Sequence, residues 1–124
     1  MEALTREVEK LTAAGVDIII ALGHSGYLMD KKIAEEVPNI DIIVGAHSHS
    51  FLFTQQGNRI NPSNNVIEGE LFSLSIALYL SYLGDYPTVV TNKVNQTVLV
   101  VQALAFTKYL GHLKVSEFQK KPLN

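Results

Sequence analysis

Hydrophobic residues in the first part of the chain switch between helical spacing and continuous runs. Leu4 and Val8 recur at the spacing of one helical face and Gly15 provides a stop signal, so the sequence predicts a helix over about residues 3–14. The next run, DIIIAL at residues 17–22, is continuous, apolar and rich in β-branched side chains. Such a run is typical of a strand that is covered on both faces, as in parallel sheets.

A second helix and a second apolar run follow. Met29, Ile33 and Val37 are spaced by four, and Pro38 ends the predicted helix. Residues 40–44 (IDIIV) repeat the buried-strand pattern. A strand, a helix and a strand within about 28 residues make a βαβ unit, whose two strands are parallel in nearly all known cases. Both strands therefore end at one edge of the sheet, where open α/β sheets bind their ligands.

The second half of the chain is predicted to contain further strands. Residues 54–65 are rich in Gln, Asn, Gly, Pro and Ser, which is typical of a surface loop. Over residues 72–82 the apolar positions alternate, which favours a long half-buried strand, although Leu and Ala there also suit a buried helix. Shorter strands are expected at residues 88–91, 97–101 and 110–115, with turns at 84–87 and 92–95. The predicted fold class is α/β, with a βαβ unit followed by further β-strands.

Composition narrows the class of protein. The chain has 124 residues, of which 47% are hydrophobic and 18% charged, which excludes intrinsic disorder and fits one domain or less. A net charge of −2 without a dense basic run argues against a nucleic-acid partner. The longest apolar tract, residues 71–83, is shorter than the roughly 20 residues of a membrane-spanning helix, and the N-terminus lacks the pattern of a secretory signal peptide. With no cysteine, any metal must be held by His, Asp, Glu or Asn.

Three histidines follow the two predicted strands of the βαβ unit. His24 lies two residues past the first strand, and His47 and His49 lie just past the second. Imidazoles from two loops at one sheet edge are a credible partial site for zinc, manganese or iron, but from spacing alone structural roles for these histidines remain open. Asp30 is expected at the start of the second helix near this site. His112, on a predicted apolar strand, is interpreted as a structural or surface residue.

Two long stretches of the sequence resemble a known family. IIIALGHSGYLMDKKIAEEVPNIDIIVGAHSHSFLFT and YPTVV followed by VLVVQALAFTKYLGHLKV are similar to the metallophosphatase domain of animal 5′-nucleotidases and the related secreted apyrases. The ALGHSG, G-x-H-x-H and VVQA…KYLG segments occur in the family's order. Together they cover about two-thirds of the chain, so their combined specificity is high.

The resemblance implies a fold, a cofactor and a reaction. It implies part of a metallophosphoesterase α/β-β-α sandwich with a dinuclear metal centre, usually zinc, in which His24 and His47 bind one ion and His49 binds the other. The implied reaction is metal-assisted removal of phosphate from nucleotides, with AMP or, in the apyrase branch, ADP and ATP as substrates. The implied location is extracellular or at the cell surface.

The resemblance covers only the later part of the catalytic domain. The family's motifs D-x-H, G-D-x-x-D and G-N-H-[DE], which carry the bridging aspartate and the catalytic His–Asp pair, are not found here, and neither is its nucleotide-binding domain. We therefore expect a partial metallophosphatase domain at residues 1–115, with an atypical insertion at about 55–85 and a polar tail at 116–124. No catalytic or substrate-binding residue is assigned. The leading hypothesis is a fragment of a 5′-nucleotidase or apyrase, and the alternative is a truncated, inactive relative that binds metal or protein.

Overall fold

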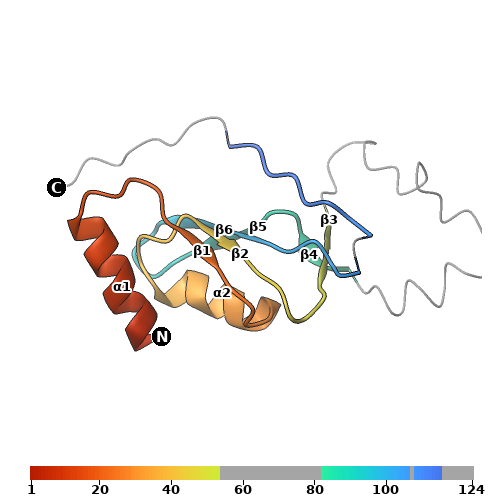
Figure 1. Cartoon of the computed structure of the whole chain (residues 1–124), viewed down its shortest axis with the longest axis horizontal. Coiled ribbons are helices and arrows are strands. Elements are labelled where there is room, and N and C mark those ends of the chain that lie inside the picture. The colour runs from red at the N-terminus through yellow and green to blue at the C-terminus, as the bar shows by residue number, and fades with distance from the viewer. Residues whose placement is uncertain (54–81, 107, 116–124) are drawn as a thin grey trace, which may run out of the picture.

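The computed structural model describes residues 1–53, 82–106 and 108–115 of the chain. The regular elements run in the order α1 (Glu2–Ala13), β1 (Ile20–Leu22), α2 (Tyr27–Glu36), β2 (Ile42–Val44), β3 (Phe51–Phe53), β4 (Tyr82–Asp85), β5 (Thr88–Thr91) and β6 (Thr97–Val101). Figure 1 shows α2 lying along one face of the main sheet, α1 at one end of the molecule, and β3 and β4 toward the other end. Both predicted helices and the strands β5 and β6 are therefore confirmed.

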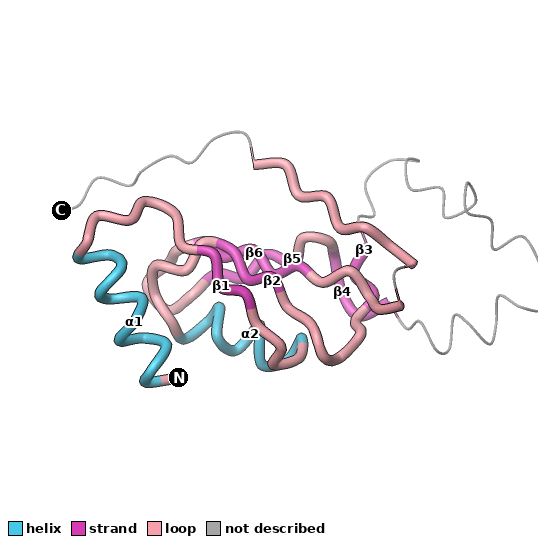
Figure 2. The backbone as a smooth tube through the Cα atoms, viewed as in Figure 1, coloured by secondary structure: helices cyan, strands magenta, loops and turns pink. Residues whose placement is uncertain are grey.

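The main sheet contains four strands in the order β1-β2-β6-β5. β1 pairs with β2 in parallel, β2 pairs with β6 in parallel, and β5 pairs with β6 in the antiparallel direction. In the traces of Figures 1 and 2, α2 connects β1 to β2 across this sheet. The predicted βαβ unit is confirmed, and the fold is a small α/β arrangement with a mixed sheet. Three parallel strands, β1, β2 and β6, thus end at the same edge.

The boundaries of α2 and of the β5–β6 hairpin have local causes. The helix ends at Glu36 because Val37, which precedes Pro38, is extended with φ −100° and ψ 112°. The hairpin turn is closed by the Asn92 side chain, whose Oδ1 accepts hydrogen bonds from the backbone nitrogens of Val94 and Gln96 at 3.1 and 2.8 Å. The predicted turn at residues 92–95 is therefore confirmed.

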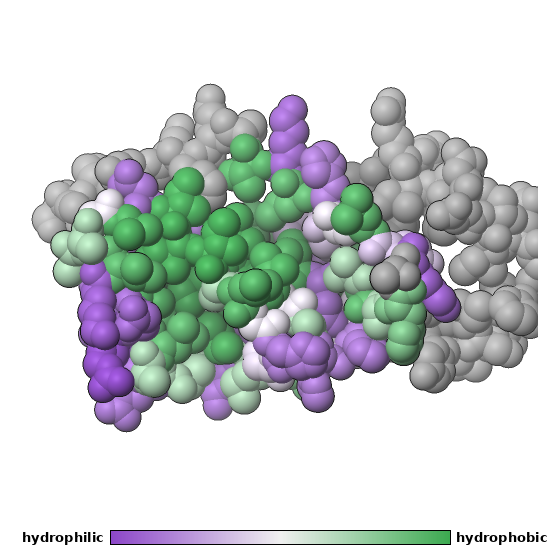
Figure 3. Space-filling view, in the orientation of Figure 1, coloured by the Kyte–Doolittle hydropathy of each residue, from purple (hydrophilic) through white to green (hydrophobic). Residues whose placement is uncertain are grey.

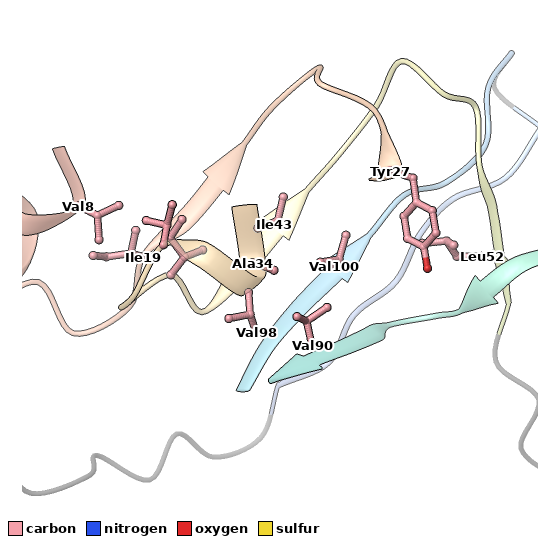
Figure 4. Packing of buried hydrophobic residues seen from close by; sticks show 11 residues of the cluster. Val8, Ile19, Tyr27, Ala34, Ile43, Leu52, Val90, Val98 and Val100 are labelled. Atoms are coloured by element: carbon pink, nitrogen blue, oxygen red, sulfur yellow. The ribbon is translucent and has the colours of Figure 1, made fainter. Parts of the chain in front are cut away.

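The hydrophobic core lies between α2 and the main sheet. Ala34 of α2 is buried with Ile43 of β2, Val98 and Val100 of β6 and Val90 of β5 (Figure 4). Burial of these β-branched side chains in the centre of the sheet is the main stabilising contribution, at about 25 cal/mol per Å² of apolar surface. The core therefore fixes β2 and β6 side by side beneath α2.

Two smaller groups extend the core toward its ends. Val8 of α1 belongs to the same cluster as Ile19, just before β1, and Figure 4 shows the two side chains close together. At the other end, Tyr27 and Leu52 are buried near each other. The hydroxyl of Tyr27 also shares a 2.8 Å hydrogen bond with that of Thr88 at the start of β5. The first turn of α2 is thereby held against the sheet.

The prediction that residues 17–22 form a fully covered strand differs from the structure. Ile20 and Leu22 of β1 are 58% and 84% exposed, and the space-filling view in Figure 3 shows a broad apolar surface. The expectation that residues 17–22 form a strand covered on both faces is wrong for the described chain. β1 is an edge strand of only three residues, and α2 packs mainly against β6 and β5, toward the other side of the sheet.

Several predictions for the second half of the chain are wrong or lie outside the described residues. The predicted strand at residues 110–115 is wrong: these residues have no regular structure, and Leu110 is 94% exposed. The predicted turn at 84–87 is a bend at residues 86–87, because Gly84 and Asp85 belong to β4, which pairs with the unpredicted strand β3. The expected loop at 54–65, nearly all of the alternating tract at 72–82 and the tail at 116–124 lie outside the described residues. Within the described part, no helix is long and apolar enough to cross a membrane.

Candidate metal centre

The candidate site lies where β1 and β2 end. The sheet's hydrogen bonding continues past the strands, because Gly23 N donates to Val44 O at 3.0 Å and Gly45 N donates to Val101 O at 2.9 Å. The two loops that carry the histidines therefore begin from fixed backbone positions. This placement confirms that the histidine loops share one sheet edge.

His24 and His47 are brought together. Their ring centroids are 5.3 Å apart and their planes cross at 64°, and both residues are exposed. Two imidazoles on one tetrahedral zinc ion, with Zn–N distances of about 2.0–2.1 Å, have centroids about 5 Å apart. The centroid separation of His24 and His47 is therefore similar to that of two imidazoles on one zinc ion.

His49 is not part of that pair. Its ring contacts Phe106 edge to face, with centroids 5.2 Å apart and planes at 73°. Among the residues that the structure describes, no group of three or more His, Asp or Glu side chains is arranged to hold a metal ion. The described chain therefore presents two of the three predicted ligands together, and His49 stands apart from them.

The loop that carries His47 and His49 has an unusual backbone. Both residues have positive φ, 73° and 49° respectively. For residues with a side chain this left-handed conformation costs about 1–2 kcal/mol per residue, so surrounding contacts must hold it. Such contacts are present around this loop.

The side chain of Gln102, the first residue after β6, holds both ends of the loop. Its Oε1 accepts a short hydrogen bond from the backbone nitrogen of Ser50, and its Nε2 donates to the backbone oxygen of Ala46 at 3.0 Å. Gln102 is 3% exposed, so these hydrogen bonds form away from water. Sequence analysis missed Gln102, although a polar residue directly after a buried strand is a detectable signal.

Ser48 links this loop to the first turn of α2. Its hydroxyl accepts a hydrogen bond from Tyr27 N at 2.9 Å and donates to Gln102 Oε1 at 3.2 Å. It also shares a 2.8 Å hydrogen bond with the hydroxyl of Ser50. The histidine loop after β2 is therefore fixed relative to the segment that follows His24.

Asp30 lies buried beneath the two loops. It is 1% exposed, and its Oδ1 accepts a 2.5 Å hydrogen bond from the Ser25 hydroxyl. Its Oδ2 has no hydrogen-bond partner within the described ranges and lies where a Cβ on Gly45 would be. The expectation that Asp30 lies at the start of α2 near this site is confirmed, because Asp30 belongs to the first turn of the helix, whose N-cap is Gly26 with φ 91°. His112, an exposed residue on a loop, takes no part in this arrangement.

Known proteins match nearly the whole chain. No protein-family model matches it. The chain is 46% identical over 119 residues to a 5′-nucleotidase of Bos taurus and 47% identical over 121 residues to a 5′-nucleotidase of Mus musculus, which covers 96% and 98% of this chain. It spans only 17% and 18% of the length of those relatives. Among solved structures, the 5′-nucleotidase precursor from Thermus thermophilus matches 83% of this chain with a TM-score of 0.60 and 35% identity, through 16% of its own length.

Proposed function

Because the chain corresponds to one segment of the 5′-nucleotidase family, we propose that it is the part of a phosphohydrolase that supplies metal-binding histidines and that the whole protein removes phosphate from nucleotides. The observation that carries this proposal is the pairing of His24 with His47 at the carboxyl edge of the sheet, at a separation that suits one zinc ion. The identity with the mammalian 5′-nucleotidases extends over almost the whole chain and supports the same assignment.

The residues of this chain have separate roles in the proposed site. His24 and His47 each offer an imidazole nitrogen to the same divalent ion, zinc in this proposal, and His49 is assigned to a second ion. A bound ion supplies Lewis-acid polarisation of a phosphate ester and an attacking water of lowered pKa. Gln102 and Ser48 hold the loops. The remaining ligands are assigned to parts of the protein outside the described residues.

The proposal extends to substrate, organisation and location. The substrate is a nucleotide, AMP or ADP and ATP, and the location is extracellular or at the cell surface. Residues 1–115 are assigned to a partial metallophosphatase domain with an insertion at about 55–85, and residues 116–124 to a polar tail.

One observation favours a second candidate function. The apolar side chains on the outer face of β1 are exposed, and large exposed apolar surfaces often mark interaction sites. In this second function the protein uses this face, or the histidine pair, to bind protein or metal without hydrolysis. The two functions differ in whether the histidines support phosphate release.

Zinc binding tests the site. We expect the 124-residue chain to bind at most one zinc ion, weakly, because two imidazoles supply only half of a tetrahedral coordination shell. In a competition titration with a chromophoric chelator, His24→Ala and His47→Ala should each weaken binding at least tenfold. His112→Ala is the matched control and should change binding less than twofold. Two tight sites, or equal binding by all variants, would contradict the assignment.

Phosphate release tests the reaction. The isolated chain should hydrolyse AMP only very slowly, and rapid hydrolysis by it would contradict our reasoning. A chimera in which this chain replaces the matching segment of the mouse 5′-nucleotidase should release phosphate from AMP, and His47→Ala in that chimera should abolish release. A folded chimera that binds zinc without releasing phosphate would favour the binding-module function instead.

A further inference from the structure

Gln102 occupies a position that makes it more than a buried polar residue. It follows β6 immediately, and β6 pairs in parallel with β2, so Gln102 stands beside the start of the histidine loop that follows β2. Its backbone continues a strand that is hydrogen-bonded on both sides, and its side chain is buried. A rigid support of this kind can dictate the conformation of a neighbouring loop.

The two ends of the Gln102 amide reach the two residues that flank the segment His47-Ser48-His49. Nε2 donates to the oxygen of Ala46, and Oε1 accepts from the nitrogen of Ser50. Both partners belong to the backbone, so the amide fixes the path of the chain between them. The loop must then turn within three residues, which agrees with the positive φ of both histidines.

The same amide reaches the second loop through Ser48. The Ser48 hydroxyl donates to Gln102 Oε1 and accepts from the nitrogen of Tyr27, the first residue of α2. The loop that carries His24 leads directly into that helix. A displacement of Gln102 would therefore change the position of His47 and also its separation from His24.

We propose that Gln102 is a positioning residue: its side-chain amide sets the left-handed backbone of His47 and His49 and with it the pairing of His47 with His24. The consequence for metal binding rests on the proposed function, whereas the consequence for the loop does not. The proposal requires both ends of the amide, a donor for Ala46 and an acceptor for Ser50. Glutamate, with no donor, satisfies only Ser50, and methionine, which has a similar length, satisfies neither.

Gln96, at the opposite end of β6 from Gln102, supplies a control. Gln96 also uses its amide to join two segments, because its Oε1 accepts from the nitrogen of Asn39 and its Nε2 donates to the side chain of Asn39, both at 2.9 Å. Gln96 precedes β6, whereas Gln102 follows it. Replacing Gln96 removes these two hydrogen bonds and a third, which its Oε1 accepts from Asn92 Nδ2 at 3.0 Å, at a less buried position far from the histidines along the strand.

The test compares Gln102→Met, Gln102→Glu and Gln96→Met in the full chain, with two readouts. A residue with positive φ gives a strong NMR cross-peak between its own amide and α hydrogens, so this signal reports the backbone of His47 and His49 without any metal. We expect Gln102→Met to lose both strong cross-peaks and to bind zinc at least tenfold more weakly. Gln96→Met should keep the cross-peaks and change zinc affinity less than twofold.

Each other outcome has a defined meaning. Retention of both cross-peaks in Gln102→Met, or their equal loss in Gln96→Met, would overturn the proposal. If Gln102→Met does not fold, Gln102→Glu, which has nearly the same shape, decides: weakening of the cross-peaks supports a positioning role and unchanged cross-peaks contradict it. If the unaltered chain binds no zinc, phosphate release by the chimera still tests the proposed function, and the cross-peaks still decide the role of Gln102.

Discussion

Gly45 offers the sharpest test of how the candidate site is packed. It follows β2 at the start of the histidine loop, and its backbone nitrogen donates to Val101 O at 2.9 Å. A Cβ placed on Gly45 would overlap Oδ2 of Asp30 and lie 2.9 Å from the Cγ of that residue. Neither neighbour can move freely, because Gly45 is fixed by the sheet and Asp30 is buried in α2. Gly45→Ala should therefore be strongly destabilising.

The magnitude follows from two contributions. Insertion of a methyl group into a packed site costs about 1–3 kcal/mol. A displaced Asp30 would also lose its hydrogen bond from the Ser25 hydroxyl, a loss of about 1–3 kcal/mol. We expect the free energy of unfolding to fall by about 3 kcal/mol in total, which for a domain near 100 residues corresponds to a lowering of Tm by about 12 °C or more.

Gly23→Ala is the matched control for this experiment. Gly23 starts the other histidine loop, and a Cβ there would meet only the Ser25 hydroxyl oxygen, at 3.9 Å. Neither Gly23 nor Gly45 has a positive φ, so backbone strain does not separate them. The alanine also reduces the entropy of the unfolded chain, so Gly23→Ala should be neutral or stabilising by up to about 1 kcal/mol. Urea denaturation followed by far-UV circular dichroism measures both variants.

A double-mutant cycle identifies the cause of the loss. In an Asp30→Ala background the carboxyl group is gone, so Gly45→Ala should cost less than about 1 kcal/mol, and the two substitutions should couple by about 2 kcal/mol. If Gly45→Ala costs the same in both backgrounds, the overlap with Asp30 is not the reason for the glycine, and the reasoning is refuted.

Three further predictions concern the core, the edge strand and one phenol. Val98→Ala should lower the free energy of unfolding by about 2 kcal/mol because the side chain is fully buried, whereas Val94→Ala, at a residue 53% exposed, should change it by less than about 0.5 kcal/mol in urea denaturation. Leu22→Lys on the exposed face of β1 should change the free energy of unfolding by less than about 0.5 kcal/mol in urea denaturation, because the side chain is 84% exposed. Burial raises the pKa of the Tyr86 phenol above its ordinary value of 10.0. The free energy of unfolding is therefore unaffected by this group at pH values below 10.0 and falls as the pH rises from 10.0 through the raised pKa. Tyr86→Phe should remove this fall in urea denaturation at alkaline pH.

Local sequence patterns predicted the elements whose neighbours are close in the chain. The spacing of Met29, Ile33 and Val37 defined α2, and Pro38 marked its end, because both signals act within a few residues. The hairpin of β5 and β6 was found for the same reason, since its turn is closed by the side chain of Asn92. These elements depend on little else, which is why they could be predicted.

The wrong predictions concern segments whose burial or strand pairing depends on residues far away in the sequence. The apolar run around Ile20 predicted a strand covered on both faces, yet in the described chain β1 is an edge strand with one bare face. Residues 110–115 alternate in the manner of a strand, but a strand forms only when its backbone groups find partners, and none of the described residues provides a ladder for them. The periodicity shows that a segment is suited to form a strand, and hydrogen bonding to a neighbouring strand decides whether that strand forms.

The candidate site shows the same division between local and distant information. The location of His24 and His47 at one edge followed from the βαβ unit, which spans short distances in the sequence. The contact of His49 with Phe106 could not be predicted, because it depends on how the segment after β6 returns toward the loop. The support of the loop by Gln102 joins it to Ser50 across 52 positions of the sequence, a separation that no local pattern spans.

The topology of the sheet explains why these distant residues meet. β1, β2 and β6 are adjacent and parallel, so their carboxyl ends lie at one edge, and each is followed within a few residues by one part of the site. β1 leads to His24, β2 to His47 and β6 to Gln102. The rule that ligands bind beyond the ends of parallel strands therefore applies to the supporting residue as well as to the ligands. This rule identified the histidines from the sequence because β1 and β2 are joined by one helix. It missed Gln102 because no short segment of the sequence predicts that β2 pairs with β6. A site of this kind is precise because each loop starts from the same hydrogen-bonded sheet, even though the loops themselves are exposed.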